Sequence, residues 1–385
     1  MKNILIHGMV IISLLGLAGC VARSSTFPHL GGTQPIVKIG LAAPFEGLDR
    51  PLGYDALAGA KLALSESNAT GGVGGYVVEL VALNDFGEPD EARLQAREFA
   101  ADPAVLGVIT GWTSETMRAS VAVYQQVGLA VAVPWSVLPE LADRGSGVVL
   151  VAADAQQSAY ALTKAVAATY PRRLVVVGDG PSATLYEESA DELGLNVYLL
   201  PPPDVLDSEI TQEWVNHLVW GQPDALILAM DGARTGETIL TLAEEDWSGT
   251  TLGGVESGSI HLVNVAGSLA AGLTFVSPAP AGQDVAQHEG NLTQEKEGLG
   301  PRAVLAYDAT HVLLDAIELA IQEDGYPSRQ GVTAALPKVQ RRGLTGDIVF
   351  DAAGRRADAP VWLYNIVDKS YPGRVLVSPQ ADNGE

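Results

Sequence analysis

Three features of the sequence predict an α/β protein made of two doubly wound parallel-sheet lobes. From Ile36 onward, short β-rich runs alternate with longer helical segments, which is typical of a parallel sheet covered on both faces. The alternation begins again near residue 154 after only a brief connection. The chain has 385 residues, more than one hydrophobic core usually supports. Together these features favour two similar lobes over domains separated by a long linker.

The first alternating unit is predicted to contain four strands, each followed by a helix. The helix at 54–69 is amphipathic, because Ala56, Ala60 and Ala63 recur at helical spacing, and it ends before a glycine-rich stop. In order, the predicted elements are strand 36–43, helix 54–69, strand 77–83, helix 89–101, strand 105–110, helix 114–127, strand 129–133 and a short helix at 137–142.

The second unit repeats this pattern after a β-rich run at 148–154. Its predicted elements are helix 155–170, strand 173–179, helix 182–193, strand 195–200, helix 208–220, strand 224–230, helix 235–245 and strand 250–255. The remaining chain predicts a strand at 270–276, a Gly/Gln/Glu-rich loop up to Pro301, a long helix at 303–323, and two β-rich runs at 347–351 and 360–366.

The charge of the chain argues against nucleic acid as a partner. There are 46 Asp and Glu residues against 23 Lys and Arg residues, which gives a formal net charge of -23. Such a surface repels a phosphate backbone. The acidic residues are spread along the sequence, as expected for a solvated surface that keeps an exported protein in solution.

Residues 1–19 have the composition of an export signal. Lys2 precedes an apolar stretch centred on Val10 to Leu15, and small residues follow. The signal ends in Leu17-Ala18-Gly19-Cys20, which resembles the lipobox of bacterial lipoproteins, in which the cysteine is lipidated. The alternative is an unmodified cysteine just inside a cleaved signal.

Cys20 is the only cysteine of the chain, so an internal disulfide is excluded and lipid attachment is its predicted role. Residues 20–35 are then a lipidated tether rich in Ser, Thr, Gly and Pro. No later run reaches 18 apolar residues, so the lipid is the only expected membrane contact. We expect an exported protein anchored on the outer face of the cytoplasmic membrane.

The sequence lacks the common motifs that carry catalysis. It has no G-x-S-x-G elbow, no H-E-x-x-H, no Walker A loop, and no G-x-G-x-x-G after a strand. The six histidines are scattered without metal-ligand spacing. The sequence therefore predicts a protein that is not an enzyme and uses neither a cofactor nor a metal.

Five segments, in order along the chain, resemble the type I periplasmic solute-binding proteins of the branched-chain amino-acid (leucine/isoleucine/valine) binding class. They are IVKIGLAAPFEG, NATGGVGGYVVELVALNDFGEPDEA, GWTSETMRASVAVYQQVGLAVAVPWSVLPEL, AYDATHVLLDAIELAI and LTGDIVFDAAGRRADAPVWLYNI, and the resemblance covers about residues 36–367. It implies a Venus-flytrap architecture, with three crossovers between the lobes and the ligand in the cleft. By analogy, the first lobe comprises residues 36–153 and 277–340, and the second lobe residues 154–276 and 341–385.

Two loops of the first lobe are expected to hold the ligand. At Trp112-Thr113-Ser114 a strand runs into a helix start, which suits an anion. The resemblance gives Ser114, with Thr113 beside it, the role of binding a carboxylate; the alternative is that Ser114 only caps its helix. In the next loop, Trp135 and Ser136 precede a valine at a position where the family tends to carry a hydroxyl group. Trp112 and Trp135 either flank the ligand or belong to the core.

The second lobe is expected to supply an acidic partner for a ligand amine. Glu256 lies where the family has its amine-binding glutamate, and Asp231 ends a strand of the same lobe. The predicted ligand is an amino acid or a related small carboxylate or amide, and the predicted partners are the permease subunits of an ABC importer. We expect a monomer. A sensory protein of the same fold that signals to a membrane partner stays open as an alternative.

Overall fold

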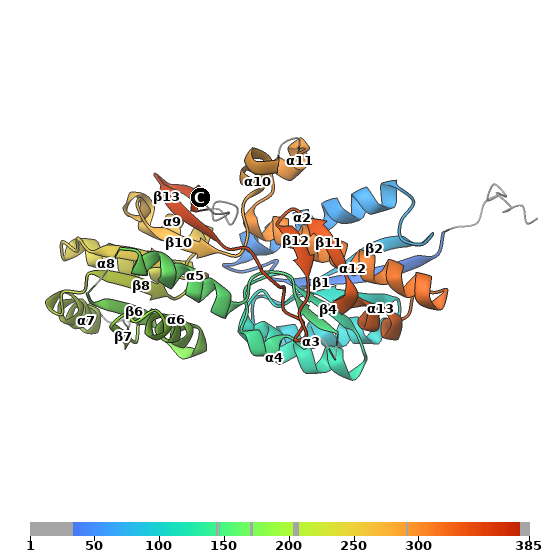
Figure 1. Cartoon of the computed structure of the whole chain (residues 1–385), viewed down its shortest axis with the longest axis horizontal. Helices are drawn as coiled ribbons and strands as arrows, with labels where there is room; N and C mark the ends of the chain where they lie inside the picture. The colour runs from blue at the N-terminus through green and yellow to red at the C-terminus, as the bar shows by residue number, and fades with distance from the viewer. Residues whose placement is uncertain are drawn as a thin grey trace, which may run out of the picture. The chain divides into compact units, whose positions relative to one another are not determined.

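The computed structural model describes residues 34–143, 145, 147–169, 172–202, 208–289 and 292–377. It confirms the predicted fold class, with two doubly wound α/β lobes that the chain connects by three crossovers (Figure 1). The predicted signal peptide, Cys20 and almost all of the predicted tether lie outside the described residues. In the described part, no helix is both long enough and apolar enough to cross a membrane.

The first sheet has five parallel strands in the order β2-β1-β3-β4-β5. This order places a switch in winding direction between β1 and β3, and ligands of open α/β sheets bind outside the carboxyl ends of strands at such a point. The strands are β1 (Ile36–Ala43), β2 (Val77–Asn84), β3 (Val105–Ile109), β4 (Ala130–Val133) and β5 (Val148–Leu150).

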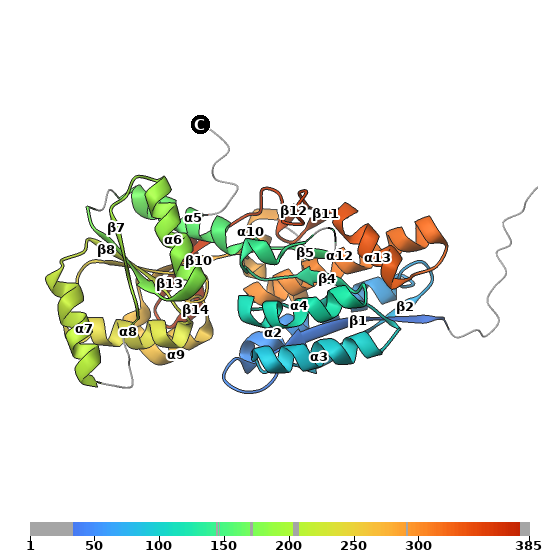
Figure 2. The ribbon, with the colours of Figure 1, turned by 90° about the horizontal axis from the view of Figure 1, so that it is seen from below.

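Helices cover both faces of this sheet (Figure 2). One pair is α3 (Pro89–Ala101) with α4 (Ser114–Gln126), and the other is α2 (Arg50–Ala69) with α12 (Pro301–Asp324). The second pair packs closely at Gly59, where an added Cβ would lie 1.9 Å from the carbonyl oxygen of Ala303. The turn η1 (Pro139–Leu141), the helix α13 (Arg329–Ala335) and the turn η4 (Leu336–Lys338) complete the elements around this sheet.

The second sheet has seven strands in the order β14-β13-β10-β9-β8-β6-β7. Its parallel part, β7-β6-β8-β9-β10, repeats the winding of the first sheet, which explains why the sequence pattern begins again near residue 154. The two last strands add antiparallel pairs that the expectation of a parallel sheet did not include. The strands are β6 (Leu174–Gly178), β7 (Val197–Leu200), β8 (Ala225–Ala229), β9 (Thr250–Gly253), β10 (Thr274–Ser277), β13 (Trp362–Val367) and β14 (Ser370–Val377).

The helices of the second lobe agree with the predicted segments, with earlier starts for two of them. They are α5 (Ala155–Ala167), α6 (Gly180–Glu192), α7 (Ser208–Trp220) and α8 (Gly232–Glu244). The sequence pattern missed several short elements, because one or two turns are too short for a periodic signal. These are α9 (Ile260–Ala266), η3 (Gly267–Ala270), α10 (Gly282–Glu289), α11 (Gln294–Glu297) and β11 (Gln340–Gly343), which pairs with β12 (Gly346–Val349) at the predicted run 347–351.

A buried arginine, Arg356, connects two crossover segments by hydrogen bonds, the one at Val151 and the one at 345–356. Arg356 is 1% exposed. Its guanidinium donates to the carbonyl oxygens of Val151 (3.1 Å), Thr345 (2.8 Å) and Asp347 (2.8 Å), and to the Thr345 hydroxyl (2.7 Å). The Asp308 carboxylate accepts from the backbone of Thr345 at 3.0 Å and adds an opposite charge near the guanidinium. The lobe boundaries predicted from the sequence stay predictions, and this contact lies close to two of them.

Candidate functional site

A cavity of about 380 Å³ is lined by residues that follow the carboxyl ends of strands in both sheets. This is the position that parallel α/β folds use for ligands. The cavity brings together all seven residues proposed from the sequence, which come from loops far apart in the chain: Trp112, Thr113, Ser114, Trp135, Ser136, Asp231 and Glu256.

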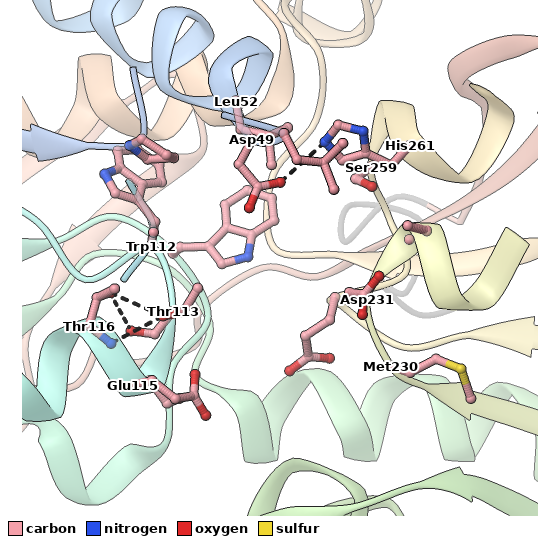
Figure 3. A pocket seen from close by; sticks show the side chains of 18 of the residues that line it. Asp49, Leu52, Trp112, Thr113, Glu115, Thr116, Met230, Asp231, Ser259 and His261 are labelled. Carbon is pink, nitrogen blue, oxygen red and sulfur yellow. Dashed lines mark hydrogen bonds and ion pairs between the residues drawn. The ribbon is translucent and has the colours of Figure 1, made fainter. Parts of the chain in front are cut away.

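The start of α4 presents a hydroxyl group and backbone N–H groups to the cavity. Thr113, not Ser114, caps this helix, because its side chain accepts from the N–H of Thr116 at 3.2 Å (Figure 3). Ser114 Oγ instead accepts from the N–H of Leu138 at 3.1 Å, which ties α4 to the loop after β4. Accepting this bond does not use the hydroxyl proton of Ser114, so the side chain retains a donor for an anion.

The side chains of the loop after β4 make more contacts within the protein than the sequence indicated. Ser136 Oγ lies 3.2 Å from Ser158 Oγ, so its hydroxyl already has a partner. Val137 is fully buried and is not among the residues that line the cavity. Trp112 donates to the carbonyl oxygen of Ala42 at 3.0 Å, and Trp135 packs against Arg302. The two indoles are therefore both core residues and cavity walls.

Glu256 has the electrostatic character expected of an amine-binding carboxylate. Its Oε2 atom is buried and has no hydrogen-bond partner among the described residues. Burial raises the pKa of Glu256, the charges of Glu115 and Asp231 raise it further, and a hydrogen bond from Ser182 opposes the shift. A bound ligand cation would stabilise the ionised carboxylate of Glu256, which burial and the neighbouring acidic groups disfavour.

Asp231 also has a structural task, because its Oδ1 atom accepts from the N–H of Arg234 at 3.0 Å and caps α8. A second acidic group next to Glu256 makes this side of the cavity strongly electronegative. Tyr186 supports the Glu256 loop through a hydrogen bond of 3.2 Å from the N–H of Val255 to its hydroxyl oxygen.

Sequence reasoning missed several cavity residues. His261 and Asp49 point toward one another in Figure 3, with 3.1 Å between Nε2 and Oδ1. Ser259 lines the cavity, is 3% exposed, and its Oγ has no partner among the described residues. Arg302 reaches the cavity from the first turn of α12. None of these residues belongs to a motif, and only the tertiary fold places them here.

Asp85 lies in the loop after β2 and also lines the cavity. It is 1% exposed, and its Oδ1 accepts from the N–H of Gly87 at 3.0 Å. Burial raises the pKa of Asp85 to about 6, with a smaller contribution from the charge of Asp49. The folded state therefore favours the protonated form more than the unfolded state does.

We expect Asp85→Asn to stabilise the protein at pH 7 and to have little effect at pH 4. The raised pKa means that ionisation of Asp85 lowers stability as the pH rises through the range from about 4 to about 6. Asparagine keeps the acceptor for Gly87 but carries no charge, so the gain at pH 7 is about 3 kcal/mol. Urea unfolding of both proteins between pH 4 and pH 8 measures the difference. Asp90→Asn, at an exposed position, is the control, and a difference independent of pH would contradict this cause.

Two doubly wound lobes that line one polar cavity at their strand ends are typical of a two-lobed binding protein. The sequence model described as periplasmic binding protein matches residues 36–370 of the chain, which therefore belongs to this family. The chain is 24% identical to the leucine-, isoleucine-, valine-, threonine-, and alanine-binding protein of Pseudomonas aeruginosa over 364 residues, which cover 89% of this chain and 92% of that protein. The alignments with an amino acid binding protein of Pseudomonas aeruginosa and with the Leu/Ile/Val-binding protein of Citrobacter freundii cover only 29% and 44% of those relatives.

Solved structures agree with this assignment of the fold. A leucine binding protein from Thermotoga maritima has a TM-score of 0.75 and 21% identity, over 90% of this chain and 99% of that chain. A fatty acid ABC transporter substrate-binding protein from Thermomonospora curvata has a TM-score of 0.74 and 18% identity, over 90% of this chain and 93% of that chain. The fold is thus shared by proteins with different ligands, and the residues of the cavity must decide what this one binds.

Proposed function

We propose that this chain is an extracytoplasmic solute-binding lipoprotein, not an enzyme, that captures an amino acid or a related small carboxylate or amide. The observation that carries the proposal is Glu256 Oε2, which has no hydrogen-bond partner among the described residues and lies at a cavity that the start of α4 with Ser114 also lines. These two features offer an acceptor for an ammonium group and donors for a carboxylate. The relatives named for amino acids support the same class of ligand.

Isothermal titration of the purified mature protein in detergent tests the ligand class. The panel contains the common amino acids, small carboxylates without an amine, and the matching amides. We expect saturable binding of at least one amine-bearing ligand at one site per chain. If every titration is blank, the proposed ligand class is wrong.

We also propose that the captured solute is delivered to the permease subunits of an ABC importer. The family assignment supports this role. Deletion of the gene is expected to reduce uptake of the labelled solute by intact cells, and re-expression of the wild-type chain is expected to restore it. Unchanged uptake in the deletion strain would argue against delivery.

The membrane anchor is proposed from the sequence Leu17-Ala18-Gly19-Cys20. Two or more acyl chains on Cys20 would retain the protein on a membrane, because each buried methylene contributes about 0.8 kcal/mol. Metabolic labelling with a palmitate analogue is expected to mark the wild-type protein and not Cys20→Ser. Equal labelling of both proteins would exclude this cysteine as the attachment site.

A further inference from the structure

We infer that Arg302 binds the carboxylate of the solute, so that the site selects carboxylates over the corresponding amides. The inference rests on the proposed function of the cavity and narrows its ligand class. Arg302 lies in the first turn of α12, lines the cavity and is only 8% exposed. It belongs to a helix packed on the first sheet, whereas Glu256 follows β9 of the second sheet.

The guanidinium is held in place by an aromatic surface. Its central carbon lies 4.0 Å from the centroid of the Trp135 ring, and Trp135 is itself buried. Stacking of this kind fixes a planar guanidinium and leaves the N–H groups at its edge free to donate in the plane. A carboxylate matches that edge with two parallel hydrogen bonds, whereas an amide offers only one acceptor.

The neighbours of Arg302 compensate its charge only in part. Asp55 is the nearby carboxylate, but it also accepts from the backbone N–H groups of Gly300 (3.2 Å) and Ala303 (3.0 Å) at the start of α12. Tyr371 shares a side-chain hydrogen bond with Arg302. A guanidinium has five N–H donors, so one phenol leaves donors for a ligand. A buried cation that is incompletely paired favours an anion in the space beside it.

Other polar groups of the cavity fit a ligand with two opposite poles. Val137 brings no hydroxyl to the cavity and Ser136 already contacts Ser158, so donors on the side of Trp135 come from Ser114 and Arg302. The opposite pole consists of Glu256 and Asp231. Burial raises the pKa of Glu256, and the charges of Asp231 and of Glu115, which follows Ser114 on α4, raise it further. Ser259 Oγ, buried and without a partner in the described chain, adds a further polar contact.

Paired titrations of wild-type protein, Arg302→Gln and Arg302→Lys test this inference. The probes are L-alanine, L-leucine and L-phenylalanine, each with its carboxamide, which keeps the amine and the side chain. The mature protein in detergent is used throughout. Arg50→Gln is the matched control, because Arg50 also stacks on an aromatic ring, that of Tyr54 at 5.2 Å, but is exposed and does not line the cavity.

We expect the wild-type protein and Arg50→Gln to prefer the carboxylate over the amide by about 100-fold. Arg302→Gln should lose most of the affinity for the carboxylate and change the affinity for the amide by less than about threefold, so that the preference collapses. Arg302→Lys keeps the charge without the planar fork and should retain an intermediate preference. If Arg302→Gln does not fold, the preference of Arg302→Lys still tests the inference.

Three results would overturn the inference. Wild-type protein that binds an amino acid and its amide equally well would remove Arg302 from the recognition of the carboxylate while leaving the proposed function intact. A folded Arg302→Gln or Arg302→Lys variant with the full wild-type preference would do the same. No binding of any common amino acid by the wild-type protein would remove the inference together with the amino-acid ligand class.

Discussion

Replacing Glu256 with glutamine is expected to weaken the binding of an amine-bearing solute by about 100-fold or more. The variant keeps the size of the side chain and removes the charge that would face the ammonium group. Because Oε2 of Glu256 is buried and has no hydrogen-bond partner in the described part of the chain, the ion pair would form away from water, where the loss of one charge is most costly. Isothermal titration of both proteins measures the change. Glu188→Gln, at an exposed position on α6, is the control.

The raised pKa of Glu256 gives this prediction a second readout. An ammonium group binds the ionised carboxylate, so binding should release a proton when the pH lies near the raised pKa, and affinity should fall as the pH is lowered below it. Titrations in two buffers with different ionisation enthalpies detect the proton. An affinity that is the same for wild-type protein and Glu256→Gln at every pH would remove Glu256 from the site.

Arg356→Met is expected to lower the free energy of unfolding by about 3 to 5 kcal/mol. The substitution leaves the carbonyl oxygens of Val151, Thr345 and Asp347 without their donor, and it leaves the buried Asp308 without its counter-charge. Burial already raises the pKa of Asp308, and loss of the arginine would raise it further. Chemical denaturation followed by circular dichroism measures the loss.

Two further variants separate the hydrogen-bonding geometry from the charge of Arg356. Arg356→Lys keeps the charge but cannot reach all of the acceptors, so it should recover only part of the stability. Arg374→Met, at an exposed position in β14, should unfold like the wild-type protein. If Arg356→Met were as stable as Arg374→Met, the network around Arg356 would not be what fastens the crossover segments.

The two lobes could be predicted from the sequence because many of their strands are continuous apolar runs. The segments at 105–109 and 225–229 are buried at every position, as parallel strands covered on both faces must be. The repeat of this pattern predicted a second winding, and the order β7-β6-β8-β9-β10 bears it out. The antiparallel pairing of β13 with β10 has no such signature, because the two strands lie more than 80 residues apart in sequence.

Part of the cavity lining could be predicted from the sequence for a related reason. Ser114, Trp135 and Glu256 each follow a recognisable strand, and strand ends meet at one edge of a sheet. Arg302 and His261 follow no strand directly; each belongs to a helix whose position is set by long-range packing. The sequence alone could not decide whether Ser114 caps α4; in the structure its neighbour Thr113 is the N-cap.

The packing of α2 against α12 has a consequence for how the chain acquires its structure. Gly59 and Ala303 lie in contact but are separated by the whole of the second lobe in sequence. During synthesis and export, the first 150 residues therefore emerge with an apolar helix face that stays uncovered until α12 follows. Contacts between residues so far apart in sequence form slowly. The parallel strands of the second sheet lie between residues 174 and 277 and can pair before α12 completes the first lobe. Strand β13, which joins the core of the second lobe through Trp362 and Tyr364, emerges only after α12.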